Sequence, residues 1–270
     1  MIIISVVNQK GGTAKTTTSV TMAHRLALDG YRVLLVDTDP QGHVSSALGL
    51  EKGPGIYRLV QRYQNLPDPL LVVSAREGLD VIPSDRPSTE LAKRVLASLD
   101  FRSSPELVLV ATLEELALKY DVAVIDCAPS VDVLHVAALV AADWLVVPTK
   151  LDYLAIEGVN EVVLFLEEIA QSGSKVASLL GVLPTFYERR TNETIEQLDV
   201  LLDVFGDLVL PPIPTDVRLR EAPAFGQTIW EYAPRTRSVV GFREQTQLYG
   251  GYARFIIQME VSLWPNGADR

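Results

Sequence analysis

A glycine-rich loop between two different kinds of segment constrains this chain more than any other stretch of its sequence. The loop covers residues 8–18 and reads Asn-Gln-Lys-Gly-Gly-Thr-Ala-Lys-Thr-Thr-Thr. It follows the apolar run 2–7 and leads into residues 19–28, an arrangement that we interpret as strand, loop and helix. Backbone N–H groups of such a loop turn toward one anion, and the first turn of the helix adds unpaired donors. The sequence therefore predicts a phosphate-binding loop.

The spacing of two lysines indicates which type of phosphate loop this is. The ordinary pattern GxxxxGK[ST] does not fit, because Gln9 stands where its first glycine belongs. The stretch fits the deviant form KGGxGK[ST], which a second lysine, Lys10, opens. We expect Lys15 to reach the β and γ phosphates of a nucleotide and the hydroxyl of Thr16 to ligate Mg²⁺. Two lysines and a hydroxyl after a strand favour this interpretation over a plain glycine turn.

One residue departs from the deviant form. Ala14 stands where the loop normally has its last glycine. Its methyl group either narrows the space beside the phosphates or opposes a positive φ. Because the side chain is small, we expect it to be tolerated.

Length and composition limit the other possibilities. The 270 residues contain no stretch that reads as a long linker, so we expect a single domain over residues 1–270. No apolar run approaches the roughly 20 residues of a membrane-spanning helix, and the first seven residues lack the basic flank of a signal peptide. The one cysteine, Cys127, excludes an internal disulfide and a cysteine-only metal centre within one chain. We expect a cytoplasmic protein.

The charge of the chain restricts how it could bind DNA. A formal charge of −10 argues against a general attraction to polyphosphates. Residues 211–254 are the only long segment where the sign reverses, with six arginines and four acidic residues giving +2. Any DNA binding must therefore come from a local patch.

Continuous apolar runs predict strands that are covered on both faces. We expect strands over 2–7, 33–37, 79–84, 122–126, 144–149 and 179–184, with a further strand over 208–210. We expect helices over 19–28, 45–48, 56–63, from a capped start at 88–91, over 105–120, 156–171 and 239–263. Gly250 and Gly251 fall inside the last of these and indicate a break or a close contact. The alternation predicts an α/β fold, a doubly wound and mostly parallel sheet flanked by helices.

Acidic residues follow two of the expected strands. Asp37 ends the run 33–37 with Asp39 close behind, and Asp126 ends the run 122–126. Ligands of open parallel sheets bind at the carboxyl ends of the strands. An aspartate beside a phosphate loop commonly holds Mg²⁺ through water, because the ion needs an anion and keeps several waters. We therefore expect Asp126 to lie near the metal.

Four segments together resemble the ParA/Soj family of partition ATPases. They are residues 8–12 (NQKGG), 37–42 (DTDPQG), 126–130 (DCAPS) and 218–226 (RLREAPAFG). The resemblance spans nearly the whole chain in the family's order, and it is to short members without an added N-terminal DNA-binding domain. It implies a P-loop NTPase fold and a weak ATP hydrolase activity that a partner stimulates.

The resemblance also implies roles for individual residues. Lys10 matches the signature lysine that contacts phosphates bound by the other subunit, so two ATP molecules would be sandwiched in a homodimer. Asp39 matches the aspartate that orients the attacking water. The implied catalytic residues are Lys10, Lys15 and Asp39, and the implied metal site is Thr16, Asp39 and Asp126. The implied ATP contacts are Lys10, Gly11, Gly12, Thr13, Ala14, Lys15, Thr16 and Thr17, with Pro214 and Asp216 for the adenine.

Partners follow from the same resemblance. ATP-bound dimers of such proteins bind DNA non-specifically, and the implied contacts here are Arg218, Arg220, Arg235 and Arg237. A ParB-like centromere-binding protein or a cargo adaptor would stimulate hydrolysis. The chain would then be associated with the nucleoid and would partition a plasmid or a chromosome region.

Other functions of the same ATPase type remain alternatives. The cargo could be a protein assembly, such as a carboxysome, a chemoreceptor array or a conjugation complex. A MinD-like ATPase would need a basic amphipathic C-terminal helix, but residues 255–265 carry no cation, so we expect core packing and no membrane partner. An iron–sulfur carrier or nitrogenase-type reductase is disfavoured by the single cysteine.

Overall fold

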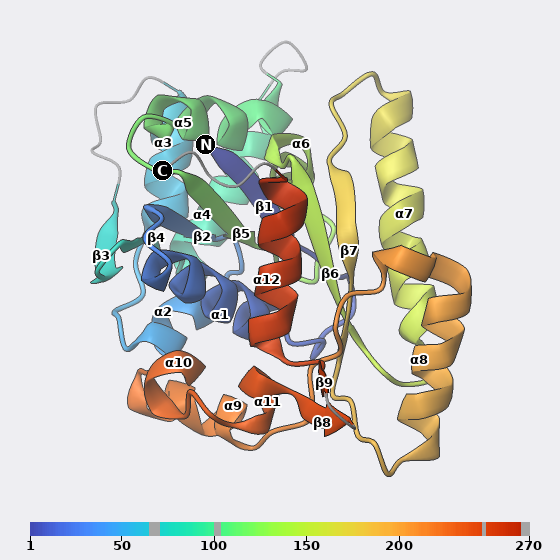
Figure 1. Ribbon diagram of the computed structural model, residues 1–270. Helices are drawn as coiled ribbons and strands as arrows, with labels where there is room; N and C mark the ends of the chain where they lie inside the picture. The colour runs from blue at the N-terminus through green and yellow to red at the C-terminus, as the bar shows by residue number, and fades with distance from the viewer. Residues whose placement is uncertain (65–70, 100–103, 245–246, 266–270) are drawn as a thin grey trace.

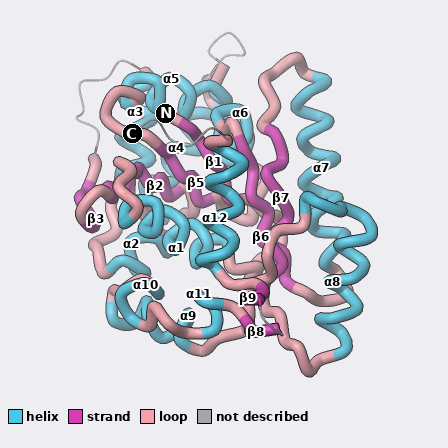
Figure 2. Tube along the Cα trace, in the orientation of Figure 1, coloured by secondary structure: helices cyan, strands magenta, loops and turns pink. Residues whose placement is uncertain are grey.

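A seven-stranded sheet organises the computed structural model, which describes residues 1–64, 71–99, 104–244 and 247–265. The strand order is β3-β4-β2-β5-β1-β6-β7, and every neighbouring pair is parallel except β3 with β4. The strands are β1 (Ile2–Val6), β2 (Val33–Asp37), β3 (Val73–Arg76), β4 (Leu79–Ile82), β5 (Val122–Asp126), β6 (Trp144–Lys150) and β7 (Ser178–Thr185). The predicted mostly parallel α/β sheet is confirmed (Figures 1 and 2).

Helices flank the sheet, and short elements gather at the bottom of the view in Figure 1. The longer helices are α1 (Lys15–Leu28), α2 (His43–Leu48), α3 (Gly55–Tyr63), α4 (Arg86–Ala97), α5 (Val108–Leu116), α6 (Val133–Ala141), α7 (Ala155–Gln171), α8 (Asn192–Phe205) and α12 (Tyr252–Leu263). The short elements are α9 (Arg218–Glu221), α10 (Ile229–Tyr232), α11 (Arg237–Val240) and the antiparallel pair β8 (Phe242–Glu244) and β9 (Gln247–Tyr249).

The central strands are apolar on both faces because helices cover both. In β2, Leu34 and Val36 belong to the core formed with α3 to α8, whereas Val33 and Leu35 belong to the core formed with α1, α2 and α12. All four side chains are fully buried. Since successive side chains of a strand point to opposite faces, a strand in this position needs a continuous apolar run, and that run predicted it.

Most of the expected elements are found close to their predicted bounds. The strands over 33–37 and 122–126 have the predicted limits, and α7 begins one residue before the expected helix 156–171. The helix expected over 105–120 is shorter, because Pro105–Leu107 form a 3₁₀ turn before α5.

The expected closing helix over 239–263 is wrong in its first half. α11 and the β8–β9 pair occupy that half, and α12 begins only at Tyr252. Gly250 and Gly251 lie before α12 with φ of +75° and +84°. A Cβ on Gly251 would lie 2.5 Å from the carbonyl oxygen of Val239. The glycine pair therefore ends one segment and allows a close backbone contact.

The expected strand over 208–210 is also wrong. Val209 makes one isolated bridge to Val182 of β7, and Gly206–Leu208 form a 3₁₀ turn. The prolines at 211 and 212 have no N–H to donate, so the ladder is interrupted until Ile213, whose N–H donates to the carbonyl oxygen of Pro184 at 2.8 Å.

The start of α4 differs from the expected start at Ser88–Leu91. The helix begins at Arg86, because the carboxylate of Asp85 accepts the backbone N–H of Ser88 at 2.9 Å. An aspartate is a strong N-cap, and here it takes the place of the hydroxyl that we expected to cap the helix.

The backbone of Gly251 generates the first prediction. Its φ of +84° and ψ of 156° lie in a region essentially restricted to glycine. We predict that Gly251→Ala lowers the free energy of unfolding by about 3 kcal/mol, measured by urea denaturation, since strain adds to the contact with Val239. The control is Gly173→Ala, where φ is +83° but nothing lies within 4 Å of the new Cβ. There we expect about 1–2 kcal/mol, and equal losses in both variants would contradict the role of the contact.

Candidate nucleotide-binding site

The glycine loop connects the carboxyl end of β1 to α1. Gly12 has φ +73° and Ala14 has φ +70° with ψ 29°, so both adopt a left-handed backbone. Of the two effects considered for Ala14, the positive φ is therefore present, and it costs about 1 kcal/mol for a residue with a Cβ. Within the described part of the chain, no side chain caps α1. The N–H groups of its first turn are thus left for a ligand.

Both lysines of the loop contact their own chain. Lys15 is 8% exposed, and its Nζ donates to the carbonyl oxygen of Lys10 at 2.9 Å. Burial lowers the pKa of Lys15, and the nearby charge of Asp126 opposes this shift. The Nζ of Lys10 donates to the carbonyl oxygen of Leu154 at 2.8 Å and to Oε2 of Glu157 at 2.9 Å. The structure therefore places Lys10 at the start of α7.

The strands β1, β2 and β5 end side by side in register. Asp126 of β5 pairs with Val6 of β1 on one side and with Asp37 of β2 on the other. Its carboxylate is fully buried and accepts the hydroxyls of Thr16 and Ser19, each at 2.7 Å. Two of the three residues predicted to hold the metal, Thr16 and Asp126, are thus in contact. Ser19 was missed, although its position three residues after Thr16 puts both hydroxyls on one face of α1.

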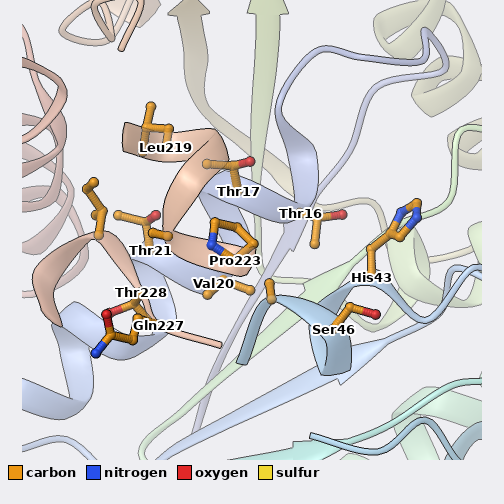
Figure 3. A pocket seen from close by; sticks show the side chains of 13 residues that line it. Thr16, Thr17, Val20, Thr21, His43, Ser46, Leu219, Pro223, Gln227 and Thr228 are labelled. Carbon is orange, nitrogen blue, oxygen red and sulfur yellow. The ribbon is translucent and has the colours of Figure 1, made fainter. Parts of the chain in front are cut away.

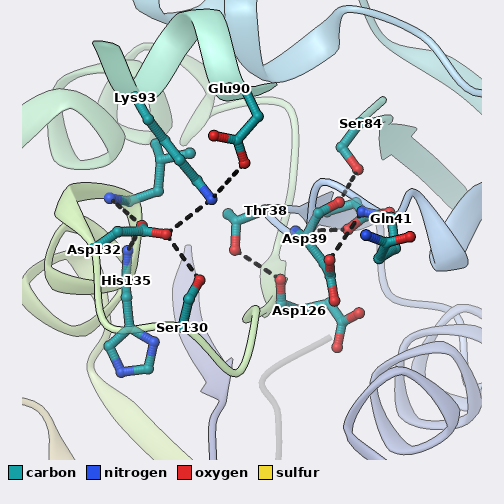
Figure 4. A network of polar contacts seen from close by, with 12 residues as sticks. Thr38, Asp39, Gln41, Ser84, Glu90, Lys93, Asp126, Ser130, Asp132 and His135 are labelled. Carbon is teal, nitrogen blue, oxygen red and sulfur yellow. Dashed lines mark hydrogen bonds and ion pairs between the residues drawn. The ribbon is translucent and has the colours of Figure 1, made fainter. Parts of the chain in front are cut away.

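Asp37 had no predicted role, and the structure gives it one. Its carboxylate accepts the backbone N–H of Asp39 at 3.0 Å and that of Val44 at 3.2 Å. The hydroxyl of Ser84 donates to the carbonyl oxygen of Asp39. These contacts fix the turn that carries Asp39, whose side chain lies beside that of Asp126 (Figure 4).

The buried carboxylates at this edge perturb one another. Burial raises the pKa of Asp126 to about 6, while the hydroxyls of Ser19 and Thr16 oppose the shift and the charge of Asp39 adds to it. Burial and the charge of Asp126 also raise the pKa of Asp37. A divalent cation would offset this repulsion, and Mg²⁺ is usually held by one or two carboxylates plus waters.

The described residues contain no larger set of carboxylate, thiolate or imidazole ligands of the kind that would indicate a different metal. Among the residues described, no three His, Cys, Asp or Glu side chains gather as a ligand set. The chemistry of this edge therefore fits an oxygen-bound ion that keeps several waters.

The predicted adenine residues lie next to the loop. Pro214 and Asp216 line a cavity of about 220 Å³ together with Ala14, Thr17 and Phe186. This cavity joins the carboxyl end of β7 to the start of α1. It is a suitable place for the nucleoside of a ligand whose phosphates lie on the loop.

The carboxylate of Asp216 is already engaged within the chain. It accepts the backbone N–H groups of Arg218 at 3.0 Å and Ser238 at 3.2 Å, and the hydroxyl of Thr236. Burial favours a higher pKa, but these hydrogen bonds hold the pKa of Asp216 below its usual value. Asp216 thus supports one wall of the cavity by fixing residues 236–238.

A second cavity, of about 290 Å³, lies against the first turns of α1 (Figure 3). Its walls come from α1, from α2 and from the segment that runs from α9 to the start of α10. The lining residues are Thr16, Thr17, Val20, Thr21, His43, Ser46, Ala47, Leu219, Ala222, Pro223, Gln227, Thr228 and Ile229. The family-like segment 218–226 therefore lies against the helix that carries the loop.

The four arginines predicted to contact DNA are all exposed. Arg220 lines the 220 Å³ cavity, and Arg218 donates from Nη1 to the hydroxyl of Thr236 at 3.0 Å. Arg235 lies in the turn between α10 and α11, and Arg237 begins α11.

Arg237 also belongs to a basic group that the sequence analysis did not identify. It lines a cavity of about 690 Å³ with Arg189 and Arg190 from the turn after β7. The guanidinium groups of Arg189 and Arg237 lie 5.6 and 5.3 Å from the ring centroid of Phe242. The adjacent Arg-Arg pair at 189–190 was the available signal, and it lies outside the segment 211–254 that the charge balance selected.

The C-terminal helix is part of the core, as expected. Tyr252, Phe255 and Met259 of α12 are fully buried. Within the ranges that the structure describes, no helix has both the length and the apolar character needed to cross a bilayer.

Comparison with known proteins decides the family. A sequence profile described as an AAA domain matches residues 1–178. The sporulation initiation inhibitor protein Soj of Bacillus subtilis is 37% identical over 239 residues, covering 87% of this chain and 92% of that protein. The chromosome-partitioning ATPase Soj of Thermus thermophilus is 37% identical over 243 residues, covering 89% and 92%. This chain belongs to the ParA/Soj family of partition ATPases.

Solved structures of similar proteins share the fold of this chain. The cobyrinic acid a,c-diamide synthase of Mycobacterium smegmatis, with a bound ATP analogue and magnesium, is 32% identical. Its TM-score is 0.71, and the match covers 84% of this chain and 93% of that one. Apo McdA from Cyanothece, 24% identical with a TM-score of 0.77, covers 87% and 94% and has the same fold.

The raised pKa of Asp126 generates the second prediction. A folded-state pKa of about 6, above the unfolded value of 3.8, means that the folded protein binds the proton more tightly. Its stability therefore falls as pH rises from about 4 to 7. We predict that Asp126→Asn raises the free energy of unfolding by about 2–3 kcal/mol at pH 7.5 without Mg²⁺, since one pKa unit is 1.36 kcal/mol. Urea denaturation between pH 4 and 8 should show the gain vanishing near pH 4, and a loss of stability at pH 7.5 would contradict it.

Proposed function

We propose that this ParA/Soj family chain hydrolyses ATP with Mg²⁺ in a homodimer that encloses two nucleotides. The observation that carries the proposal is Lys10 and Lys15 in one loop, with Asp39 and Asp126 on adjoining strand ends beside it. In this proposal residues 1–270 act as one ATPase domain. The ATP analogue and magnesium bound by the Mycobacterium smegmatis protein support the choice of both ligands.

Different residues around the loop bind the phosphates, the adenosine and the metal in this proposal. Lys15 and the backbone of Gly11, Gly12 and Thr13 hold the phosphates, and the adenosine occupies the cavity at Pro214 and Asp216, with Thr17 between the two. Thr16, Asp126 and Asp39 would hold Mg²⁺, which would supply positive charge next to the phosphate oxygens. Asp39 also orients the attacking water, a role suited to a half-buried turn that Asp37 and Ser84 fix.

Lys10 acts on the nucleotide of the other subunit. A cation supplied in trans can be worth about 10³–10⁵ in the rate of phosphoryl transfer. Because that cation arrives only with the second subunit, hydrolysis depends on the dimer, and loss of the γ-phosphate removes a contact that holds the dimer together.

In the ATP state the dimer binds DNA non-specifically. It partitions a plasmid or chromosome region on the nucleoid, and a ParB-like partner stimulates its weak hydrolysis. The partition function of the Thermus thermophilus relative supports this part of the proposal. The local basic group formed by Arg189, Arg190 and Arg237 supports it as well, because the net charge of −10 cannot supply a general attraction.

Substitutions of the two lysines should impair different steps, ATP binding for Lys15 and dimer formation for Lys10. We predict that Lys15→Ala weakens ATP binding about 10- to 100-fold, because hydrogen bonds to charged groups contribute about 1.5–3 kcal/mol. Lys10→Ala should bind ATP nearly as well as the wild type but remain monomeric. Isothermal titration calorimetry measures the first effect and light scattering with ATP the second. An ATP-dependent dimer of Lys10→Ala would contradict the trans role.

DNA binding should depend on nucleotide and on salt. We predict binding of a non-specific duplex only with ATP and Mg²⁺, and no binding with ADP or without nucleotide, in titrations followed by surface plasmon resonance. Arg237→Ala should reduce the slope of log K against log salt by about 2, because the dimer loses two phosphate contacts. Arg94→Ala, an exposed arginine on α4, is the control and should leave the slope unchanged. No binding in any state would favour a protein cargo or a membrane instead.

A further inference from the structure

The signature lysine is held by its own subunit in this structure. The ammonium group of Lys10 has two acceptors at the start of α7, the carbonyl oxygen of Leu154 and the carboxylate of Glu157. The side chain of Lys10 is 24% exposed and that of Glu157 is 61% exposed. Two of the three N–H donors of the Lys10 ammonium group are thus engaged by α7 of the same subunit.

The first turns of α7 are shaped to accept this lysine. A Cβ on Gly158 would lie 3.1 Å from Cδ and 3.4 Å from Cε of Lys10, and 3.3 Å from Oδ1 of Asn8. Glycine within a helix costs about 1 kcal/mol relative to alanine, so the close approach of the lysine stem gives a physical reason for glycine here. Asn8 fixes the same stretch, since its Oδ1 accepts the backbone N–H of Lys10 at 2.9 Å and its Nδ2 donates to the carbonyl oxygen of Pro148.

The loop connects this contact to the phosphate site of the same subunit. The Nζ of Lys15 donates to the carbonyl oxygen of Lys10 at 2.9 Å. Phosphates bound in the loop would take over the donors of Lys15. The carbonyl oxygen of Lys10 would then lose the shorter of its two hydrogen bonds and keep only the one from the hydroxyl of Thr13, at 3.4 Å. The backbone that positions the Lys10 side chain would be held less firmly.

We propose that Glu157 is a positioning residue that retains Lys10 at α7 in the nucleotide-free subunit. ATP bound in the same subunit must release Lys10 from Glu157 before the lysine can contact the nucleotide of the partner subunit. This inference rests on the proposed ATP-dependent homodimer. An ion pair this exposed is weak and salt-screened, so the retention is reversible and sets a threshold for dimer formation. Each subunit therefore forms the dimer contact through Lys10 only after it has bound its own nucleotide.

Selective acetylation tests the contact without requiring a dimer. Nucleotide-free wild type, Glu157→Gln and Glu168→Gln would be treated with an N-hydroxysuccinimide ester of acetate, and modification of Lys10 would be followed by mass spectrometry. Glu168 lies exposed on the same helix and serves as the matched control. We expect Lys10 to react at least 2-fold faster in Glu157→Gln and at the wild-type rate in Glu168→Gln. Gly158→Ala should also react faster, because its methyl group displaces the lysine stem. Equal Lys10 rates in wild type and Glu157→Gln would overturn the proposal.

Light scattering against ATP concentration tests the consequence. We expect Glu157→Gln to reach half-maximal dimer at an ATP concentration about 2- to 5-fold lower than the wild type, the range expected from a pair worth up to about 1 kcal/mol. An unchanged or higher requirement would overturn the retaining role. A wild type that stays monomeric at saturating ATP would refute the proposed function, which the acetylation rates do not depend on. The two failures are therefore distinguishable.

Discussion

The buried carboxylate of Asp126 is the contact on which the geometry of the site depends. A carboxylate out of water costs several kcal/mol unless it is well paired, and here the hydroxyls of Thr16 and Ser19 satisfy its two oxygens. Both hydroxyls belong to α1, so the contact fixes the start of this helix, which follows the glycine loop, to the end of β5. The carbonyl oxygen of Asp126 also accepts the N–H and the hydroxyl of Thr38, at 3.0 and 2.9 Å. One residue thus fixes the ends of β5 and β2 and the start of α1.

The sequence predicted those parts of the fold in which burial on both faces leaves a continuous apolar run. It failed where tertiary contacts decide the local structure. Residues 239–263 are helical in pattern, yet the positive φ of Gly250 and Gly251 interrupts them. Helix α6 had no prediction, because it is buried on nearly all sides and therefore lacks an amphipathic period. Strand β3 and helix α8 also had none, and β3 is a short, half-buried edge strand without the apolar run of the central strands.

Some residues of the candidate site could likewise be predicted from the sequence, and others could not. Lys10, Lys15 and Thr16 could be identified because a phosphate loop is a local motif whose spacing carries the chemistry. Ser19 and Asp37 could not, since their roles depend on which strand ends lie side by side in the sheet. The basic group around Phe242 was missed for a related reason. It joins the turn after β7 to α11, so no window of sequence contains it.

The glycine loop carries two lysines that have different roles in the proposed ATP-dependent dimer. Lys15 serves the nucleotide of its own subunit, and Lys10 is suited to serve the nucleotide of another, yet in this structure one hydrogen bond from Lys15 to the carbonyl oxygen of Lys10 connects them. A nucleotide whose phosphates attract Lys15 competes with that bond. Because only five residues separate the two lysines, a change at one is transmitted through the backbone without any larger movement of the sheet. In the proposed dimer, the second lysine at the start of the deviant loop would thereby make phosphate binding in one subunit a condition for contact with the next.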